Sequence, residues 1–236
     1  MKKLRKAVMG AMSGILAMVI LLGCGKEEPS KVGPESWPEE SRGNYEELIQ
    51  MVRSEIDESK NGSVTVKEDY SVALLTCGSY GIPGYLEEDI NGDGTKELIF
   101  GVTGAEEEKN GSWNSVIYDI YTVSNGETAH AVSGWERNRY YLCEDGMIAN
   151  EGSNGAADSS YSYYTFDGGK LRLKEAVIYD GMRDEENPWF YFSSGADADK
   201  FKPGQAAPIS EEQAEEIMGR YVYTRLELTP FESDKT

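Results

Sequence analysis

Apolar side chains near residue 50 recur at the spacing of one face of an α-helix. That face comprises Tyr45, Leu48, Ile49, Val52 and Ile56. Asn44 followed by Glu47 resembles a capping box, and Asn61-Gly62 is a typical helix end. The pattern therefore predicts an amphipathic helix at the start of the folded part of the chain.

A second helical pattern lies near the C-terminal end. Ser210 and Gln213 have the spacing of a capping box, and Gly219 is typical of the residue that follows a helix. The apolar positions between them are few: Ala214, Ile217 and Met218. We therefore expect a short surface helix with one narrow buried face.

Between these helices the apolar pattern alternates, as it does in half-buried strands. Three pairs of such runs are joined at Asn125-Gly126, Asp145-Gly146 and Asp167-Gly168. An Asn-Gly or Asp-Gly pair between β-rich runs is a strong hairpin signal. The pattern predicts an α+β fold: mainly an antiparallel β meander, with an N-terminal amphipathic helix and a short C-terminal helix.

Three shorter segments refine this picture. Leu171, Leu173 and Val177 alternate with charged residues, which predicts that they share one face of their strand. Residues 221–231 form a last apolar-rich run, which indicates a closing strand. Residues 152–160 are small and polar, which indicates a recognition loop or a mobile loop.

The first residues have the pattern of an export signal. Four basic side chains precede an apolar run, Ala7 to Gly23, which is shorter than the roughly 20 residues of a membrane-spanning helix. The run ends in Leu21-Leu22-Gly23-Cys24, which resembles the lipobox of bacterial lipoproteins. That resemblance implies cleavage before Cys24 and a diacylglycerol group on its thiol. An uncleaved N-terminal anchor is the alternative, and either places the remainder outside the cytoplasmic membrane.

The chain accordingly divides into four parts. Residues 1–23 are predicted to be a lipoprotein signal peptide, and residues 24–42 a lipidated cysteine with a disordered tether rich in proline and charge. Residues 43–231 have the length of a single extracytoplasmic domain, and residues 232–236 form a tail. The membrane, reached through the N-terminal lipid, is the first expected partner.

The net negative charge of the chain excludes some classes of binding partner. There are 23 Lys and Arg against 42 Asp and Glu, a formal charge of −19. Removal of residues 1–23 takes away four basic residues and no acidic one, which makes the charge −23. Nucleic-acid recognition needs clustered basic residues, so nucleic acid is not an expected partner. No G-x-x-x-x-G-K-[ST] loop supports nucleotide binding either.

The most informative short segment is DINGDGTKELIF, residues 89–100. Oxygen-bearing side chains occupy its first, third, fifth and ninth positions, and a glycine occupies the sixth. This spacing is typical of calcium loops, in which the seventh residue adds its carbonyl oxygen. We therefore predict a structural Ca²⁺ site formed by Asp89, Asn91, Asp93, Thr95 and Glu97. Glu87 and Glu88 are near enough in sequence to add a ligand, and a metal-free acidic hairpin turn is the alternative.

This loop carries two resemblances. It resembles the D-x-[DN]-x-D-G-x-x-[DE]-[LI] calcium loops of FG-GAP and related extracellular β proteins, and it departs from EF-hands because Phe100 stands at position 12. The chain also resembles a group of uncharacterised bacterial lipoproteins that carry DINGDG-x-x-E-L-I once after an N-terminal helix. That likeness extends over most of residues 43–231, including RNRYYL, EGSNGAADSS and ELTPF. It implies the location and the calcium loop.

The remaining reactive side chains give weaker signals. Cys77 and Cys143 are compatible with a disulfide outside the cytoplasm or with two buried thiols. The single histidine, His130, has no cysteine or second histidine at ligand spacing, so we expect a half-buried strand residue rather than a zinc ligand. No serine stands in a G-x-S-x-G motif.

Aromatic side chains gather in the β region, and Trp113 and Trp135, flanked by small or polar residues, are the candidates for ligand binding. The function expected from these features is a surface binding module for glycan or protein. A hydrolase acting on glycan or cell-wall polymer is the alternative, because two carboxylates suffice for that chemistry and the chain has many. A purely structural envelope component is a third.

Overall fold

The computed structural model describes residues 45–62, 69–77, 81–104, 115–193 and 205–231. Several sequence predictions lie outside these residues. They are the signal peptide, Cys24 and the tether, the tail, Asn44 at the start of the first helix, and Trp113.

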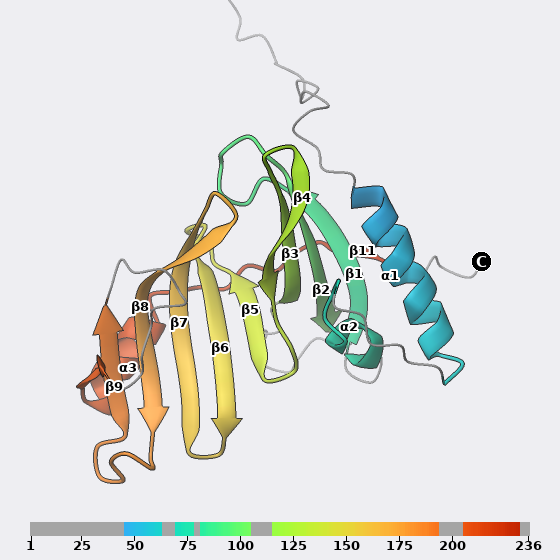
Figure 1. Ribbon diagram of the computed structural model, residues 1–236. Coiled ribbons are helices and arrows are strands. Elements are labelled where there is room, and N and C mark those ends of the chain that lie inside the picture. Colours follow the sequence, from blue (N-terminus) through green and yellow to red (C-terminus); the bar gives the residue numbers. More distant parts are fainter. Residues whose placement is uncertain (1–44, 63–68, 78–80, 105–114, 194–204, 232–236) are drawn as a thin grey trace, which may run out of the picture. The chain divides into compact units, whose positions relative to one another are not determined.

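The described strands form one antiparallel sheet (Figure 1). Its hydrogen-bonded order is β10-β9-β8-β7-β6-β5-β3-β2-β1-β11, and β4 pairs with β3 beside this path. Most neighbours in the sheet are neighbours in sequence, so the predicted meander is confirmed. The strands are β1 Gly81–Glu88, β2 Glu97–Gly104, β3 Val116–Ser124, β4 Glu127–Ser133, β5 Asn138–Leu142, β6 Ile148–Gly155, β7 Asp158–Asp167, β8 Lys170–Asp180, β9 Trp189–Ser193, β10 Ala207–Pro208 and β11 Thr229–Pro230.

Three helices accompany the sheet in the described part of the chain: α1 Tyr45–Ser59, α2 Ala73–Thr76 and α3 Glu211–Met218. Helix α1 buries Tyr45, Ile49, Val52 and Ile56, the face that the sequence predicts. Helix α3 begins with the predicted capping box, in which Ser210 accepts the N–H of Gln213 and the Gln213 side chain accepts the N–H of Ser210. Both helices therefore follow from local sequence signals.

The predicted hairpins are present. Asn125 and Gly126 have φ values of 54° and 80°, so the β3–β4 turn needs residues that tolerate positive φ. The β7–β8 turn likewise places Gly168 and Gly169 at positive φ, between the paired residues Asp167 and Lys170. These turns set the register of the strands on either side.

Two segments differ from their predictions. Residues 152–160 are not a loop, because β6 and β7 pair Gly152 with Ser160 and Ser153 with Ser159. Small side chains are compatible with the close approach of these strands. Residues 221–231 do not form one closing strand either. Only Thr229–Pro230 pairs with β1, and Tyr223 makes an isolated bridge to Cys143.

The sheet is buried on both faces over β2 and β3. Leu98, Phe100 and Val102 pack with helix α1 in one core cluster, whereas Ile99 and Ile117 belong to a second cluster on the opposite face. Strand β4 contacts β8, and the second cluster also contains Phe166 and Leu173 from β7 and β8, so the sheet curls around this cluster. Burial on both faces explains why the β2 run is continuously apolar.

A register shift in β7–β8 corrects one prediction. Tyr163 pairs with Glu175 and Tyr164 with Leu173, so Lys174 is an extra residue on β8. A bulge of this kind reverses the faces to which the following residues point. Val177 therefore packs near helix α3, on the face opposite to Leu173, and not with Leu171 and Leu173 as the alternation predicts.

The two described cysteines are free and buried. Of the two alternatives, the structure therefore has buried thiols and no disulfide between Cys77 and Cys143. Burial raises the pKa of the Cys77 thiol to about 11 and that of Cys143 to about 12, so both are protonated near neutral pH. They act as small apolar side chains in the core that contains α1.

No helix among the described residues is long and apolar enough to cross a membrane.

Candidate functional site

The predicted calcium loop connects β1 to β2. Its first residue, Asp89, organises it: the Asp89 carboxylate accepts the N–H groups of Gly92 at 2.8 Å, Asp93 at 3.1 Å and Gly94 at 2.9 Å. Gly92 and Gly94 have φ values of 73° and 89°, a region that favours glycine. The tandem Asn-Gly and Asp-Gly pairs therefore let the chain wrap around one carboxylate.

The middle of the loop is held by its own polar groups. Asp93 Oδ1 accepts the N–H of Thr95 at 2.8 Å, and Asp93 Oδ2 accepts the Asn91 amide at 2.9 Å. The Tyr45 hydroxyl of helix α1 donates to the carbonyl of Lys96 at 2.8 Å. The loop is thus compact and connected to the first helix.

Glu97, at the ninth position, is fully buried with an exposed fraction of 0%. Its carboxylate accepts the N–H of Ile90 at 3.2 Å and the hydroxyl of Thr122 at 2.9 Å. Burial, with a smaller contribution from the charges on Asp93 and Asp89, raises the pKa of Glu97 to about 7, against the lowering effect of the two hydrogen bonds. The carboxylates of Asp89 and Asp93 therefore interact electrostatically with Glu97 and favour its protonated form.

The chemistry of this donor set fits calcium. Every predicted ligand binds through oxygen, as Ca²⁺ prefers. Three of the ligands are acidic residues, Asp89, Asp93 and Glu97, and the other two are Asn91 and Thr95. Within the described ranges, however, no three His, Cys, Asp or Glu side chains are grouped as a metal centre. The loop carboxylates accept the loop's own N–H groups instead. Glu88 is paired directly opposite Glu97 across the hairpin.

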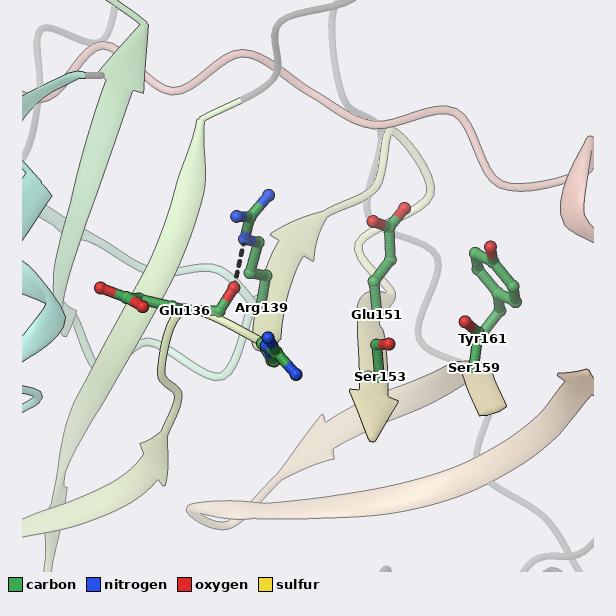
Figure 2. Close-up of a pocket in the computed structure, with 8 residues that line it drawn as sticks. Glu136, Arg139, Glu151, Ser153, Ser159 and Tyr161 are labelled. Atoms are coloured by element: carbon green, nitrogen blue, oxygen red, sulfur yellow. Dashed lines mark hydrogen bonds between the residues drawn. The ribbon is translucent and has the colours of Figure 1, made fainter. Parts of the chain in front are cut away.

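A second candidate site is a groove over strands β5, β6 and β7, which we call the β5–β7 groove. It has a volume of about 260 Å³. Figure 2 shows side chains from the three strands standing along it. Its lining residues are Glu136, Arg137, Arg139, Glu151, Gly152, Ser153, Ser159 and Tyr161.

Strand register places these side chains together. Arg139 pairs with Glu151, which pairs with Tyr161, and residues paired directly across antiparallel strands project to the same face. Ser153 and Ser159 are paired one step further along that face. The groove therefore presents a row of polar side chains, with carboxylates, guanidinium groups, hydroxyls and one aromatic ring.

Neighbouring residues orient the charged members of the groove. The Tyr223 hydroxyl donates to the Glu151 carboxylate at 2.9 Å, and the Tyr223 ring stacks on Tyr141 at 4.5 Å. Arg139 Nε donates to the carbonyl of Glu136 at 2.8 Å (Figure 2). Burial and the nearby Glu151 carboxylate raise the pKa of Tyr161, so its hydroxyl keeps its proton. A ligand would therefore meet preoriented donors and acceptors.

Trp135 is exposed but does not line the groove. Its side chain is 50% exposed. Trp135 and Asn138 exchange two backbone hydrogen bonds of 2.9 Å, which makes Glu136 and Arg137 the tip of a tight turn. Because Trp135 is paired with Asn138, it projects to the face opposite to Arg139. Sequence composition alone identified the exposed ring but not the groove on the other face.

Sequence reasoning missed the groove, although one signal for it was present. Arg137 and Arg139 are two residues apart in RNRYYL, so two basic side chains lie close together in a strongly acidic chain. The register with β6 and β7, which brings Glu151 and Tyr161 beside them, depends on pairing that this segment does not encode.

Comparisons of the chain with protein-family models, with curated proteins and with solved structures find no match.

Proposed function

We propose that this protein is a lipid-anchored extracytoplasmic module that binds a glycan in the β5–β7 groove. The location rests on the basic start, the apolar run and the Leu-Leu-Gly-Cys boundary at Cys24. The binding role rests on the groove. With a lipid anchor at one end and a polar groove in the folded domain, the protein would hold its ligand near the membrane.

The observation that carries the glycan proposal is the row Arg139, Glu151 and Tyr161 across three strands. Sugars present many hydroxyls, which charged side chains of both signs bind as donors or acceptors. The Tyr161 ring offers an apolar surface beside them. Arg137 and Arg139 stand beside Glu136 and Glu151, so the charges in the groove balance, which favours a neutral, hydroxyl-rich glycan.

The calcium loop has a structural role in this proposal. Asp89, Asn91, Asp93 and Glu97 would hold the ion with side-chain oxygens and Thr95 with its carbonyl. The ion would supply positive charge to an acidic hairpin. Because Tyr45 donates to Lys96 at the end of this loop, the ion would also secure helix α1 against the sheet.

A hydrolase is the second candidate, because two carboxylates, Glu136 and Glu151, line the same groove. Glycoside hydrolysis requires one carboxyl group as acid and another as base or nucleophile. Release of reducing sugar from a bound glycan, lost in both Glu136→Gln and Glu151→Gln, would identify an enzyme. Binding without turnover identifies a module.

Lipidation at Cys24 is the first testable consequence. Mass spectrometry of the membrane fraction is expected to find diacylglycerol on Cys24 of a chain that starts at this residue. A Cys24→Ser variant should retain the signal peptide, because the lipidated cysteine directs cleavage in the family that the lipobox resembles. Identical processing and membrane retention of the two proteins would contradict the anchor.

Glycan binding is the second consequence. On a glycan array, the full chain is expected to bind neutral, hydroxyl-rich glycans above carboxylate-bearing ones. Arg139→Gln and Glu151→Gln should each weaken binding tenfold or more, about 1.4 kcal/mol, because each removes one charged partner from the row. Calorimetric titration of the best array ligand measures this change.

Trp135→Ala is the matched control for the groove variants, because the indole is exposed on the opposite face of the same turn. It should leave the affinity unchanged. Loss of binding in Trp135→Ala, with full binding in Arg139→Gln, would show that the glycan binds on the opposite face and not in the β5–β7 groove. An array on which no glycan is bound would refute the glycan proposal and favour a protein ligand.

A further inference from the structure

The β5–β7 groove continues onto strands β8 and β9 as a row of side chains. Ser153 and Ser159, which line the groove, are paired with each other (Figure 2). Ser159 is also paired with Tyr179 of β8, and Tyr179 with Trp189 of β9. Residues paired directly across antiparallel strands project to the same face, so these side chains form one row from β6 to β9.

A second row runs beside the first and has the same change of character. Tyr161, the aromatic ring of the groove, is paired with Val177 of β8, and Val177 with Tyr191 of β9. The Tyr191 hydroxyl donates to the Glu175 carboxylate at 2.8 Å. The face that carries charged groups and hydroxyls over β5 to β7 therefore becomes aromatic and apolar over β8 and β9.

The aromatic side chains at this end are held in place. Trp189 and Tyr161 pack against one buried cluster, to which helix α3 contributes Ile217. The Tyr179 and Trp189 rings lie edge to face, with centroids 5.1 Å apart and 72° between their planes. Both side chains remain partly exposed. We call Tyr179 and Trp189 the aromatic pair. Because its rings are fixed before a ligand arrives, less entropy is lost on binding.

We infer that the ligand is an oligosaccharide longer than a disaccharide, which binds in the groove and also stacks on the aromatic pair; the inference rests on the proposed glycan function. A sugar ring has hydroxyls at its edge, which the charged side chains of the groove bind, and C–H groups on its faces, which an aromatic ring covers. Neighbouring strands are about 4.8 Å apart, so β5 to β9 covers four spacings, about 19 Å. A disaccharide in the groove does not span this length.

The length of the sugar chain tests the inference. Cellobiose and cellopentaose, maltose and maltopentaose, and chitobiose and chitopentaose are titrated into the full chain and followed by calorimetry. In the series that binds, the pentasaccharide should bind about tenfold more tightly than the disaccharide, because only the pentasaccharide reaches the aromatic pair.

Variants locate the second part of the site. Trp189→Ala and Tyr179→Ala should each reduce the gain from disaccharide to pentasaccharide to about threefold or less and leave the disaccharide affinity unchanged. Unchanged disaccharide binding also shows that the variant folds. Trp135→Ala removes an exposed indole outside both rows, so it is the matched control and should keep the full gain. Arg139→Gln should weaken the binding of both sugars alike.

The possible failures are distinguishable. Equal affinities for disaccharide and pentasaccharide, or the full gain in both Trp189→Ala and Tyr179→Ala, would overturn the inference and leave the groove as the binding site. A panel in which no sugar binds would refute the neutral glycan proposal together with this inference. If Trp189→Ala unfolds because its contact with the α3 cluster is lost, Tyr179→Ala decides, since Tyr179 lies outside that cluster.

Discussion

In the absence of calcium, Glu97→Gln is expected to be more stable than the wild type at pH 8 and equally stable at pH 4. The Glu97 carboxyl group has an ordinary pKa of 4.5, and burial raises it to about 7 in the folded state. Between these values the unfolded chain releases the proton while the folded chain retains it. The stability contributed by the protonated group is therefore complete below pH 4.5 and is lost as the pH rises through about 7.

The size of this effect follows from the two pKa values. Their difference corresponds to about 3 kcal/mol in the free energy of unfolding. Glutamine keeps a side-chain carbonyl that accepts from Ile90 or Thr122, and it carries no charge at any pH. Denaturant unfolding in chelator from pH 4 to pH 8 measures the difference between the two proteins.

The control for this experiment is Glu88→Gln. Glu88 is paired with Glu97 across the hairpin but is exposed, so its neutralisation should change stability by less than about 0.5 kcal/mol. The raised pKa of Asp119 adds a pH dependence of the same sign, and this part should persist in Glu97→Gln. Parallel curves for the wild type and Glu97→Gln over the whole pH range would show that Glu97 does not titrate between these values.

Calcium is expected to raise the melting temperature of a metal-free sample. If the dissociation constant is about 10⁻⁴ M, 10 mM calcium adds about 2.7 kcal/mol to the folded state. For a domain of this size that corresponds to roughly 2–4 °C per kcal/mol. Magnesium should have a smaller effect, because it holds its water more strongly and requires a smaller octahedral site. The gain should be larger at pH 8 than at pH 5, since calcium binds the ionised form of Glu97.

Variants of the loop separate calcium binding from a general salt effect. Asp93→Asn and Glu97→Gln should lose most of the calcium response, because each removes a negatively charged ligand. Asp184→Asn is the matched control: Asp184 also accepts N–H groups within a turn, from Glu186 and Asn187, but lies outside the calcium loop. Metal analysis must first show that the starting sample is stripped. A stripped sample whose melting curve is unchanged by calcium would identify an acidic hairpin turn without a metal role.

The local sequence determined the elements whose signals involve only neighbouring residues. The periodic face of α1, the capping box at Ser210 and the Asn125-Gly126 turn each depend on helix or turn geometry within a few residues. The tight wrapping of the loop around the Asp89 carboxylate belongs with them, since the glycines and the N–H groups that this carboxylate accepts all lie between residues 89 and 94.

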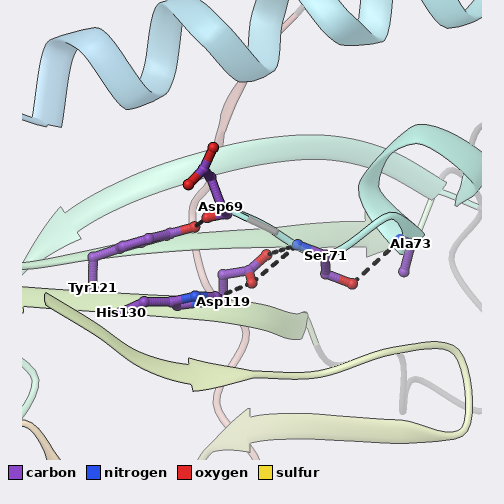
Figure 3. Close-up of polar contacts among 6 residues, drawn as sticks. All are labelled: Asp69, Ser71, Ala73, Asp119, Tyr121 and His130. Carbon is purple, nitrogen blue, oxygen red and sulfur yellow. Dashed lines mark hydrogen bonds and ion pairs between the residues drawn. The ribbon is translucent and has the colours of Figure 1, made fainter. Parts of the chain in front are cut away.

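The tertiary structure alone decided the features that join distant parts of the chain. A bulge at Lys174 reversed the face of Val177, and pairing with β7 turned a polar segment into the end of β6. The β5–β7 groove exists because register aligns Arg139, Glu151 and Tyr161. Asp119 gains its hydrogen-bond partners from Ser71 and His130, which lie 48 and 11 residues away in sequence (Figure 3). The periodicity of apolar residues determines whether a segment forms a helix or a strand. Its register and burial depend on which distant segment packs against it. This packing in turn determines the pKa values of buried groups and the position of the groove.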